Sequence, residues 1–142
     1  MQAQEELAKL WYKYAQDYRL HMEQHLAPTL TEGQFTVLDY LLDRPLEFVK
    51  PSDLLPHLST TPAAVTTLLD RMEKNGLIMR KRDDQDRRIV WIMPTDKGKS
   101  EGDRGRQVRR QFFEQTLDRL SRHNQQLFIY LFGKVAAASD ND

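Results

Sequence analysis

Two adjacent arginines, Arg87 and Arg88, end a strongly charged run that begins at Asp83, and this run holds the residue types best suited to binding chemistry. Guanidinium groups are planar, permanently charged and rich in hydrogen-bond donors, so they suit a negatively charged partner. Asp86 stands beside the arginines, and we expect it to hold one of them in place by an ion pair, either one being possible. The run therefore predicts an exposed site that binds an anionic partner.

No catalytic motif accompanies this run. Serine, histidine and acidic residues are present, but no nucleophile elbow, glycine-rich phosphate loop or metal-binding motif surrounds them. The sequence contains no cysteine, which excludes disulfides, thiolate metal sites and sensing by thiol oxidation. We therefore expect a protein that is not an enzyme and that has no cofactor.

Two histidines four residues apart, His21 and His25, are the remaining candidates for site chemistry. On a helix this spacing can chelate a metal, and His57 and His123 exist to complete such a site. The alternative is that both make ordinary hydrogen bonds at a boundary between domains or subunits. Because no cysteine or clear carboxylate partner is present, we expect no metal.

A hairpin must position the charged run. Residues 77–82 and 88–93 are rich in β-forming side chains, and they predict two strands joined by a loop of about 4–6 residues. The helix before the hairpin has clear ends: Thr61 predicts its N-cap, Pro62 its first turn and Asn75-Gly76 its left-handed stop. Its first turn carries small side chains, so this end of the helix can approach another surface closely.

Two further helices and a distorted one are predicted before that unit. Residues 4–26 carry a helical stripe of these side chains: Leu7, Trp11, Tyr14, Tyr18, His21 and His25. Residues 32–42 form a helix opened by a capping box of Thr31 and Gln34, and its expected inward side chains are Phe35, Leu38 and Leu42. Residues 51–58 form a short helix that Pro56 distorts, because proline inside a helix removes a hydrogen bond.

A long helical segment follows the hairpin. Thr95 predicts its N-cap, and the helix runs from about Asp96 to Ala138 with a break at residues 121–124. The apolar stripes of the first and last helices exceed what one small unit can cover. A symmetric dimer made by these helices would bury the surplus. We expect the tail, residues 139–142, to fray.

Composition places the chain in a broad class. Its 142 residues are enough for one domain with a real core. No apolar run approaches the roughly 18 residues of a membrane span, and the acidic amphipathic start is no signal peptide. We therefore expect a cytoplasmic protein without a membrane partner.

The net charge is zero, but the charge is unevenly distributed. Residues 1–60 hold 5 basic and 9 acidic side chains, a balance of −4, whereas residues 80–110 hold 11 and 6, a balance of +5. A neutral protein with one basic end can still meet a polyanion locally. Within that end, we expect four side chains to form a solvated helix face: Arg104, Arg106, Arg109 and Arg110.

Four segments, in this order and spacing, resemble the multiple-antibiotic-resistance regulator (MarR) family of bacterial transcription factors. They are Leu30-Thr31-x-x-Gln34-Phe35-x-x-Leu38, residues 65–80, residues 83–88 and Thr95-x-x-Gly98. Asp84 stands where the family's wing commonly has proline, and Pro94 where leucine usually precedes the threonine. These departures bear on the rigidity of the wing and on the end of the last strand.

The resemblance implies a mainly α fold with a small β-wing in a single MarR-like protomer, residues 1–142. A winged helix-turn-helix would occupy residues 30–98, and long terminal helices, residues 1–27 and 99–142, would form a dimerisation region. The implied activity is that of an obligate homodimer on a pseudo-palindromic promoter site, usually a repressor released by a small ligand or oxidant. The implied partners are double-stranded operator DNA and a second copy of the chain.

Physical reasoning from the residues supports the implied binding to DNA. A helix that begins with small side chains can enter a major groove, and arginines at a hairpin tip suit the negative potential of a narrow minor groove. The residues expected to contact DNA are Thr61, Ala63, Ala64, Thr66, Thr67, Arg71, Arg80, Arg82, Asp86, Arg87 and Arg88.

Two alternatives stay open. The neutral net charge, and Asp70 on the presumed reading face, favour a winged-helix protein-interaction module that has lost DNA binding. The aromatic stripe of the first helix is either a core or dimer contact, or it lines a pocket for a small aromatic or amphipathic effector. In the second case the expected ligand-binding residues are Trp11, Tyr14, Tyr18, His21 and Phe35.

Overall fold

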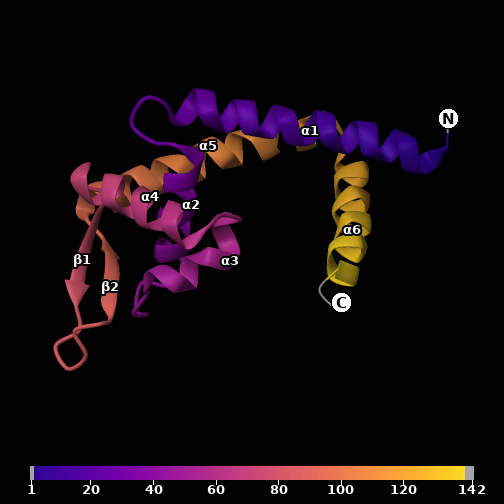
Figure 1. Cartoon of the computed structure of the whole chain (residues 1–142). Helices are drawn as coiled ribbons and strands as arrows, with labels where there is room; N and C mark the ends of the chain where they lie inside the picture. Colours follow the sequence, from indigo (N-terminus) through magenta and orange to yellow (C-terminus); the bar gives the residue numbers. More distant parts are fainter. Residues whose placement is uncertain (1, 140–142) are drawn as a thin grey trace. The chain divides into compact units, whose positions relative to one another are not determined.

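The computed structural model describes residues 2–139 (Figure 1). We expected residues 139–142 to fray, and the last three of these residues lie outside the described part of the chain. The elements follow the order α1 (Ala3–Leu26), α2 (Glu32–Leu42), η1 (Pro51–Leu54), α3 (Leu55–Leu58), α4 (Pro62–Lys74), β1 (Ile78–Arg82), β2 (Val90–Pro94), α5 (Asp96–Asp118) and α6 (Arg122–Ser139). Two compact units, Met1–Val108 and Arg109–Asp142, divide the chain. The fold is mainly helical with a two-stranded antiparallel wing, as predicted.

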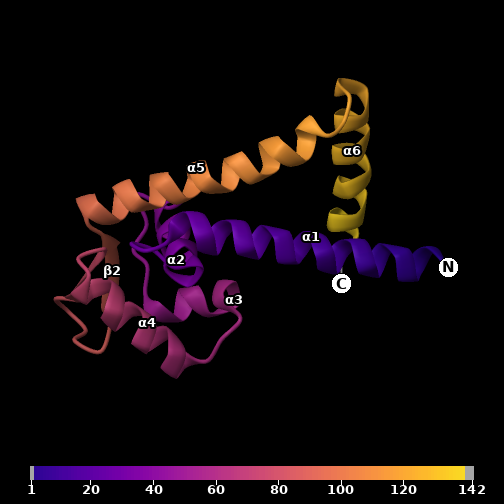
Figure 2. The same cartoon turned by 90° about the horizontal axis from the view of Figure 1, so that it is seen from above.

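In the first unit, α2, α3 and α4 gather beside the C-terminal part of α1 (Figure 2). The predicted capping box of α2 is present: Thr31 accepts a hydrogen bond from the Gln34 backbone N–H at 3.2 Å, and the Gln34 side chain accepts one from Thr31 N–H at 3.1 Å. The buried face of α2 is wider than predicted, because it includes Val37 and Leu41 while Leu42 is only half-buried. The cause is that α1, α3, α4 and β2 all pack against α2.

The expected distortion around Pro56 takes the form of a change of helix type. Pro51–Leu54 is a 3₁₀ turn, and the α-helical turn Leu55–Leu58 restarts there, so Pro56 falls in a first turn whose N–H groups need no helical partner. Ser59 then adopts a left-handed conformation, with φ of 48°, and the chain reverses into the cap of α4.

Helix α4 begins and ends where the sequence predicts. Its buried residues are Val65, Leu69 and Met72, whereas Leu68 is only half-buried. At the other end, Leu77 N–H donates to Met72 O at 2.9 Å and Gly76 N–H to Glu73 O at 3.0 Å, which is a Schellman motif. Gly76 has φ of 75°, a left-handed conformation that favours glycine. This tight stop directs the chain into β1.

Strands β1 and β2 pair in register from Ile78 opposite Pro94 to Arg82 opposite Val90. The second strand starts two residues later than predicted and includes Pro94. The loop therefore spans residues 83–89, longer than the predicted length of about 4–6 residues, because hydrogen bonds to Asp83 and Asp86 fold those residues into turns of their own. Outside the hairpin, Val49 forms one isolated antiparallel β-bridge with Ile92 of β2.

Helix α5 is joined to the end of α4 by a junction centred on Thr95. The Thr95 hydroxyl donates to Gly76 O and accepts from Gly98 N–H at 3.0 Å, so it caps α5 as predicted. Gly98 lies so close to the α4–β1 connection that an added Cβ would stand 1.9 Å from Leu77 O. Farther along, a Cβ on Gly105 would stand 2.2 Å from a ring carbon of Phe35. Glycine at these two positions therefore allows the first part of α5 to pack directly on α2 and on the α4–β1 connection.

Two of the arginines that we expected on a solvated face instead bind the helices on which α5 packs. Arg106 donates to Asp39 at 2.8 Å and to Asp43 at 2.7 Å, which ties α5 to α2. Arg104 donates to Leu26 O at 2.8 Å, to His25 O at 2.9 Å and to the Glu101 carboxylate at 2.9 Å. The prediction of a solvated face was wrong for both, because a helical charge pattern does not reveal which acceptors a neighbouring helix presents.

In the second unit, α6 follows α5 after a break at residues 119–121, slightly earlier than predicted. Ser121 accepts from Asn124 N–H at 3.2 Å and so caps α6, while the Gln125 amide donates to Leu117 O and Leu120 O. Many large hydrophobic side chains of α6 are exposed in the single chain: Leu127, Phe128, Ile129, Tyr130, Leu131, Phe132 and Val135. None of the described helices is long and apolar enough to cross a membrane.

Candidate nucleic-acid interface

The first turn of α4 presents an open, small-residue surface. Thr61 accepts from Ala64 N–H at 3.2 Å, and Thr61, Ala63 and Ala64 are all exposed. Thr66 and Thr67 are exposed too, and their hydroxyls donate to the carbonyls of Pro62 and Ala63 at 3.1 and 3.2 Å. Each hydroxyl oxygen keeps lone pairs for a further donor. This end of α4 can therefore approach a polar partner at backbone distance.

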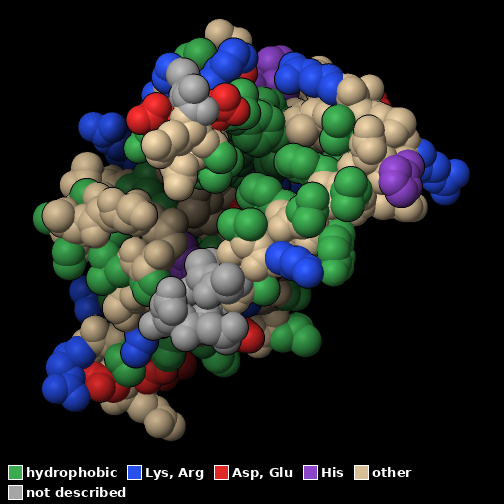
Figure 3. Space-filling view, turned by 90° about the vertical axis from the view of Figure 1, so that its right-hand side faces the viewer, with side chains coloured by type: hydrophobic (Ala, Val, Ile, Leu, Met, Phe, Trp, Pro, Cys, Tyr) green, Lys and Arg blue, Asp and Glu red, His purple; other side chains and the backbone are tan. Residues whose placement is uncertain are grey.

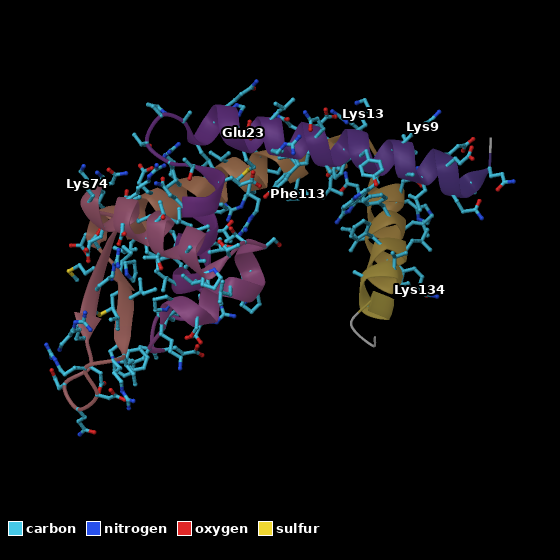
Figure 4. The ribbon with its side chains drawn as sticks, in the orientation of Figure 1. Lys9, Lys13, Glu23, Lys74, Phe113 and Lys134 are labelled. Carbon is cyan, nitrogen blue, oxygen red and sulfur yellow. The ribbon has the colours of Figure 1, made fainter. Side chains whose placement is uncertain are left out.

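Farther along α4, Arg71 is exposed, whereas Arg80 on β1 is held by the helix. Arg80 makes an ion pair with Asp70 and a second with Glu73 at 3.7 Å. The Arg80 side chain is 23% exposed, and its Nε is buried without a hydrogen-bond acceptor among the described residues. Arg80 thus joins β1 to α4, and its role in binding DNA stays a prediction. The pairing also neutralises Asp70 on this face. Lys74 lies at the end of the same helix (Figure 4).

At the wing tip, Arg88 is the arginine that Asp86 holds. Arg88 Nε lies 3.0 Å from Asp86 Oδ1, Nη2 lies 3.0 Å from Oδ2, and Arg88 N–H also donates to Oδ1 at 3.1 Å. The Arg88 side chain is nevertheless 90% exposed. The other two arginines near the tip are linked through a backbone carbonyl: Arg82 Nη1 donates to Arg87 O at 2.7 Å. Arg87 is exposed, so both guanidinium groups are open to a partner.

Asp83 organises the loop that carries these arginines, a role that sequence reasoning did not assign. Its Oδ2 accepts from Gln85 N–H at 3.0 Å and from Asp86 N–H at 2.9 Å, and its Oδ1 accepts from Trp91 Nε1–H at 3.0 Å. The available signal was an aspartate followed by three polar residues, a common start for a turn closed by a side chain. Asp84, at the position where the resembled family commonly has proline, is exposed.

Hydrogen bonding lowers the pKa of two of the wing aspartates, Asp83 and Asp86. Donation from the Asp86 backbone N–H, then from the Trp91 side chain and the Gln85 backbone, lowers the pKa of Asp83 below its ordinary value. Donation from the Arg88 side chain, then from its backbone N–H, lowers the pKa of Asp86. In return, Asp86 raises the pKa of Arg88. The scaffold of the tip is therefore fully charged near neutral pH.

The five candidate ligand-binding residues lie in different surroundings. Phe35 is buried in the core beneath Gly105, and Tyr14, Tyr18 and His21 are half-buried. Trp11 is 52% exposed and borders a hollow lined by Gln4, Leu7, Ala8, Trp11 and Tyr12. Among the described residues, the structure thus does not gather all five around that hollow.

His21 and His25 form hydrogen bonds with backbone carbonyls. His21 Nε2 lies 2.8 Å from Val108 O, and His25 Nδ1 lies 2.8 Å from His21 O. The two rings stack with their centroids 4.2 Å apart. A nitrogen that faces a carbonyl oxygen carries a proton and cannot ligate a metal at the same time. Within residues 2–139, no group of three or more acidic or histidine side chains could hold a metal ion.

Comparisons with known proteins agree with this arrangement. The family model described as "MarR family" matches residues 30–90. The transcriptional regulator HosA of Escherichia coli O111:H- is 31% identical over 134 residues, which cover 92% of this chain and 96% of HosA. YwhA of Bacillus subtilis, an uncharacterised HTH-type transcriptional regulator, is 31% identical over 84 residues, and this match covers 59% of the chain and 60% of YwhA. A mutant of MarR from E. coli, solved in complex with operator DNA, superposes with a TM-score of 0.71 at 25% identity and covers 91% of this chain and 92% of that one.

Proposed function

Because this chain belongs to the MarR family and is therefore a DNA-binding transcriptional regulator and not an enzyme, we propose that it acts as a homodimeric repressor on a pseudo-palindromic promoter site and is released by a small ligand. The observation that carries the proposal is a pair of exposed features of the first unit. These are the exposed, small-residue start of α4 and the wing whose arginines are held by hydrogen bonds yet open to solvent.

In the proposed complex, α4 enters the major groove and the wing reaches the minor groove. Thr61, Ala63 and Ala64 allow close approach, and Thr66, Thr67 and Arg71 contact base edges or thymine methyl groups. Arg87 inserts into the minor groove, and Arg88, oriented by Asp86, lies against the phosphates. Arg82 shapes the loop through the Arg87 carbonyl, and Arg80 sets the angle between α4 and the wing.

The proposed dimer uses residues 1–27 and 99–142, with residues 30–98 as the DNA-binding unit. Its support is apolar surface that the single chain leaves open, on α6 and on the N-terminal half of α1, where Leu7, Leu10 and Tyr12 are exposed. Figure 3 gives a view of hydrophobic side chains that lie open at the surface. On the polar side of α1, Lys9 and Lys13 project together (Figure 4). An amphipathic helix with one uncovered apolar face gains stability from a partner.

The proposed effector is a small aromatic or amphipathic molecule that binds near Trp11, Tyr14, Tyr18 and His21. Aromatic side chains with a polar edge suit such a ligand, because they offer both ring faces and hydrogen-bonding groups. Phe35 would act from beneath, as part of the core that α1 and α5 cover.

The second candidate function is a protein-interaction module that does not bind DNA, and one of the two observations that favoured it, the charge of Asp70, is now weaker. Asp70 would repel phosphates on the reading face if its charge were free, but it is paired with Arg80. The neutral net charge of the chain still favours this candidate, but a chain of zero net charge can carry a local basic surface that binds DNA.

The proposal predicts salt-dependent binding to the DNA upstream of the protein's own gene. In a gel-shift titration, affinity should fall linearly with salt on logarithmic axes, because cations are released when basic side chains neutralise phosphates. Light scattering at micromolar concentration should give the mass of two chains. Binding without salt dependence, or a monomer at that concentration, would contradict the proposal and favour the interaction module.

A further inference from the structure

The indole of Trp91 belongs to the hydrogen-bond network of the wing tip, although it lies on β2 and not in the loop. Trp91 Nε1–H donates to Asp83 Oδ1 at 3.0 Å. Its ring packs at a tilt against Phe48, with the centroids 5.3 Å apart, and the side chain is half-buried. The adjacent residue, Ile92, donates its N–H to Val49 O at 2.8 Å. The backbone of β2, bridged to Val49, therefore fixes the position of Trp91, and the Phe48 ring supplies an apolar contact that another hydrophobic side chain can also supply.

From this fixed point, three successive links lead to the guanidinium of Arg88. The first is the indole–carboxylate hydrogen bond to Asp83. The second is the hydrogen bond from Asp86 N–H to the other Asp83 oxygen, at 2.9 Å. The third is the bidentate pair of Asp86 with Arg88, with both distances 3.0 Å. Each link uses a different oxygen or a different residue, so the links do not compete for the same acceptor atom.

The alternative sources of order in this loop are few. The ladder contributes one bond, from Asp83 N–H to Ile89 O at 2.9 Å, and Ile89 N–H bonds within the loop to Asp86 O at 3.0 Å. Arg82 acts on Arg87 through its carbonyl and does not contact Arg88 in the described bonds. Besides the ladder bond, the hydrogen bond from Trp91, which lies on a paired strand, therefore ties the acidic half of the loop to the sheet.

We propose that Trp91 is a positioning residue for DNA binding, which holds Arg88 in its binding orientation through Asp83 and Asp86. The inference rests on the proposed function for its consequence, since it assigns how Arg88 is oriented for its contact with DNA phosphates. A pre-oriented arginine loses less conformational freedom on binding than a mobile one, so the affinity of the wing depends on the indole N–H. Trp91 itself does not need to touch DNA.

The test is Trp91→Phe, which keeps an aromatic ring against Phe48 and removes only the N–H. Affinity for the upstream DNA fragment should fall about fivefold, the effect of one ordinary hydrogen bond. In an Arg88→Ala background, Trp91→Phe should not lower the affinity further, because no guanidinium is then left at position 88 for the chain of contacts to orient. A purely structural role would still weaken binding there. The matched control is Phe48→Leu, which alters the packing and leaves the indole–carboxylate bond, and it should bind as the wild type does.

A second readout uses the protein without DNA, so that it separates this inference from the proposed function. In NMR spectra, the Arg88 Nε–H should exchange slowly in the wild type and markedly faster in Trp91→Phe. If Trp91→Phe does not fold, Asp83→Ala tests the same bond from its other side, and the Trp91 Nε1–H should then exchange faster. Unchanged Arg88 exchange in Trp91→Phe, an equal loss of affinity with and without Arg88, or the same loss in Phe48→Leu would each overturn the inference. Absence of DNA binding by the wild type would overturn the proposed function and leave the exchange result to decide on Trp91.

Discussion

Removing both wing arginines, by Arg87→Ala and Arg88→Ala together, is expected to weaken operator binding by about tenfold or more for each lost contact. Both side chains are exposed, and Arg88 is already oriented by Asp86, so both are ready to meet DNA. The salt dependence should become shallower, because fewer cations are released on binding. A fluorescence anisotropy titration at several salt concentrations measures both quantities.

The stability of the folded protein should not change in this double variant. Neither guanidinium is buried in the core, and the wing scaffold through Asp83 remains. The charge-matched control is Arg19→Ala with Arg119→Ala, which removes two exposed positive charges outside the wing. Both positions lie in the proposed dimerisation region, so light scattering must first show that this variant is still a dimer, and its affinity should then be unchanged. Equal affinity of the wing double variant and the wild type would refute the role assigned to the wing.

Replacement of Gly98 by alanine is expected to lower the free energy of unfolding by about 3 kcal/mol. The added Cβ would stand 1.9 Å from the Leu77 carbonyl oxygen, and backbone at the α4–β1 junction cannot move aside as a flexible side chain can. The clash opposes the helix preference of alanine over glycine, which alone would add about 1 kcal/mol. The thermal midpoint should fall by roughly 10 °C for a chain of this size, measured by circular dichroism at constant protein concentration.

Gly33→Ala is the matched control for this substitution. Gly33 also lies in a helix of the first unit, but a Cβ there would meet only Leu68 at 3.9 Å, an ordinary contact. We expect it to be as stable as the wild type or slightly more stable. If Gly98→Ala were as stable as Gly33→Ala, the conclusion that α5 packs tightly on this junction would be refuted.

Features encoded within a few residues were predictable from the sequence. The capping box of Thr31 and Gln34, the start of α4 at Thr61-Pro62 and its stop at Asn75-Gly76 all depend on local backbone chemistry. The order of the wing and its charged tip follows from strand propensity and turn composition. For these elements, the local preference and the final structure agree.

Features that depend on distant neighbours were not predictable in the same way. Arg106 finds Asp39 and Asp43 only after α5 has crossed α2, and Arg80 finds Asp70 only after the hairpin has folded beside α4. The choice of Arg88 over Arg87 as the partner of Asp86 depends on the turns that Asp83 imposes on the loop. Periodicity and motif spacing contain no information about such pairings.

Selection of binding sequences from a random pool of duplex DNA tests the central claim most directly. The account predicts that the wild-type protein enriches one sequence family made of two inverted half-sites, with centres roughly one helical turn apart, because a two-fold dimer presents two copies of α4. Enrichment of a single half-site without symmetry, or of no shared sequence at low salt, would contradict a dimeric reader built on α4 and the wing.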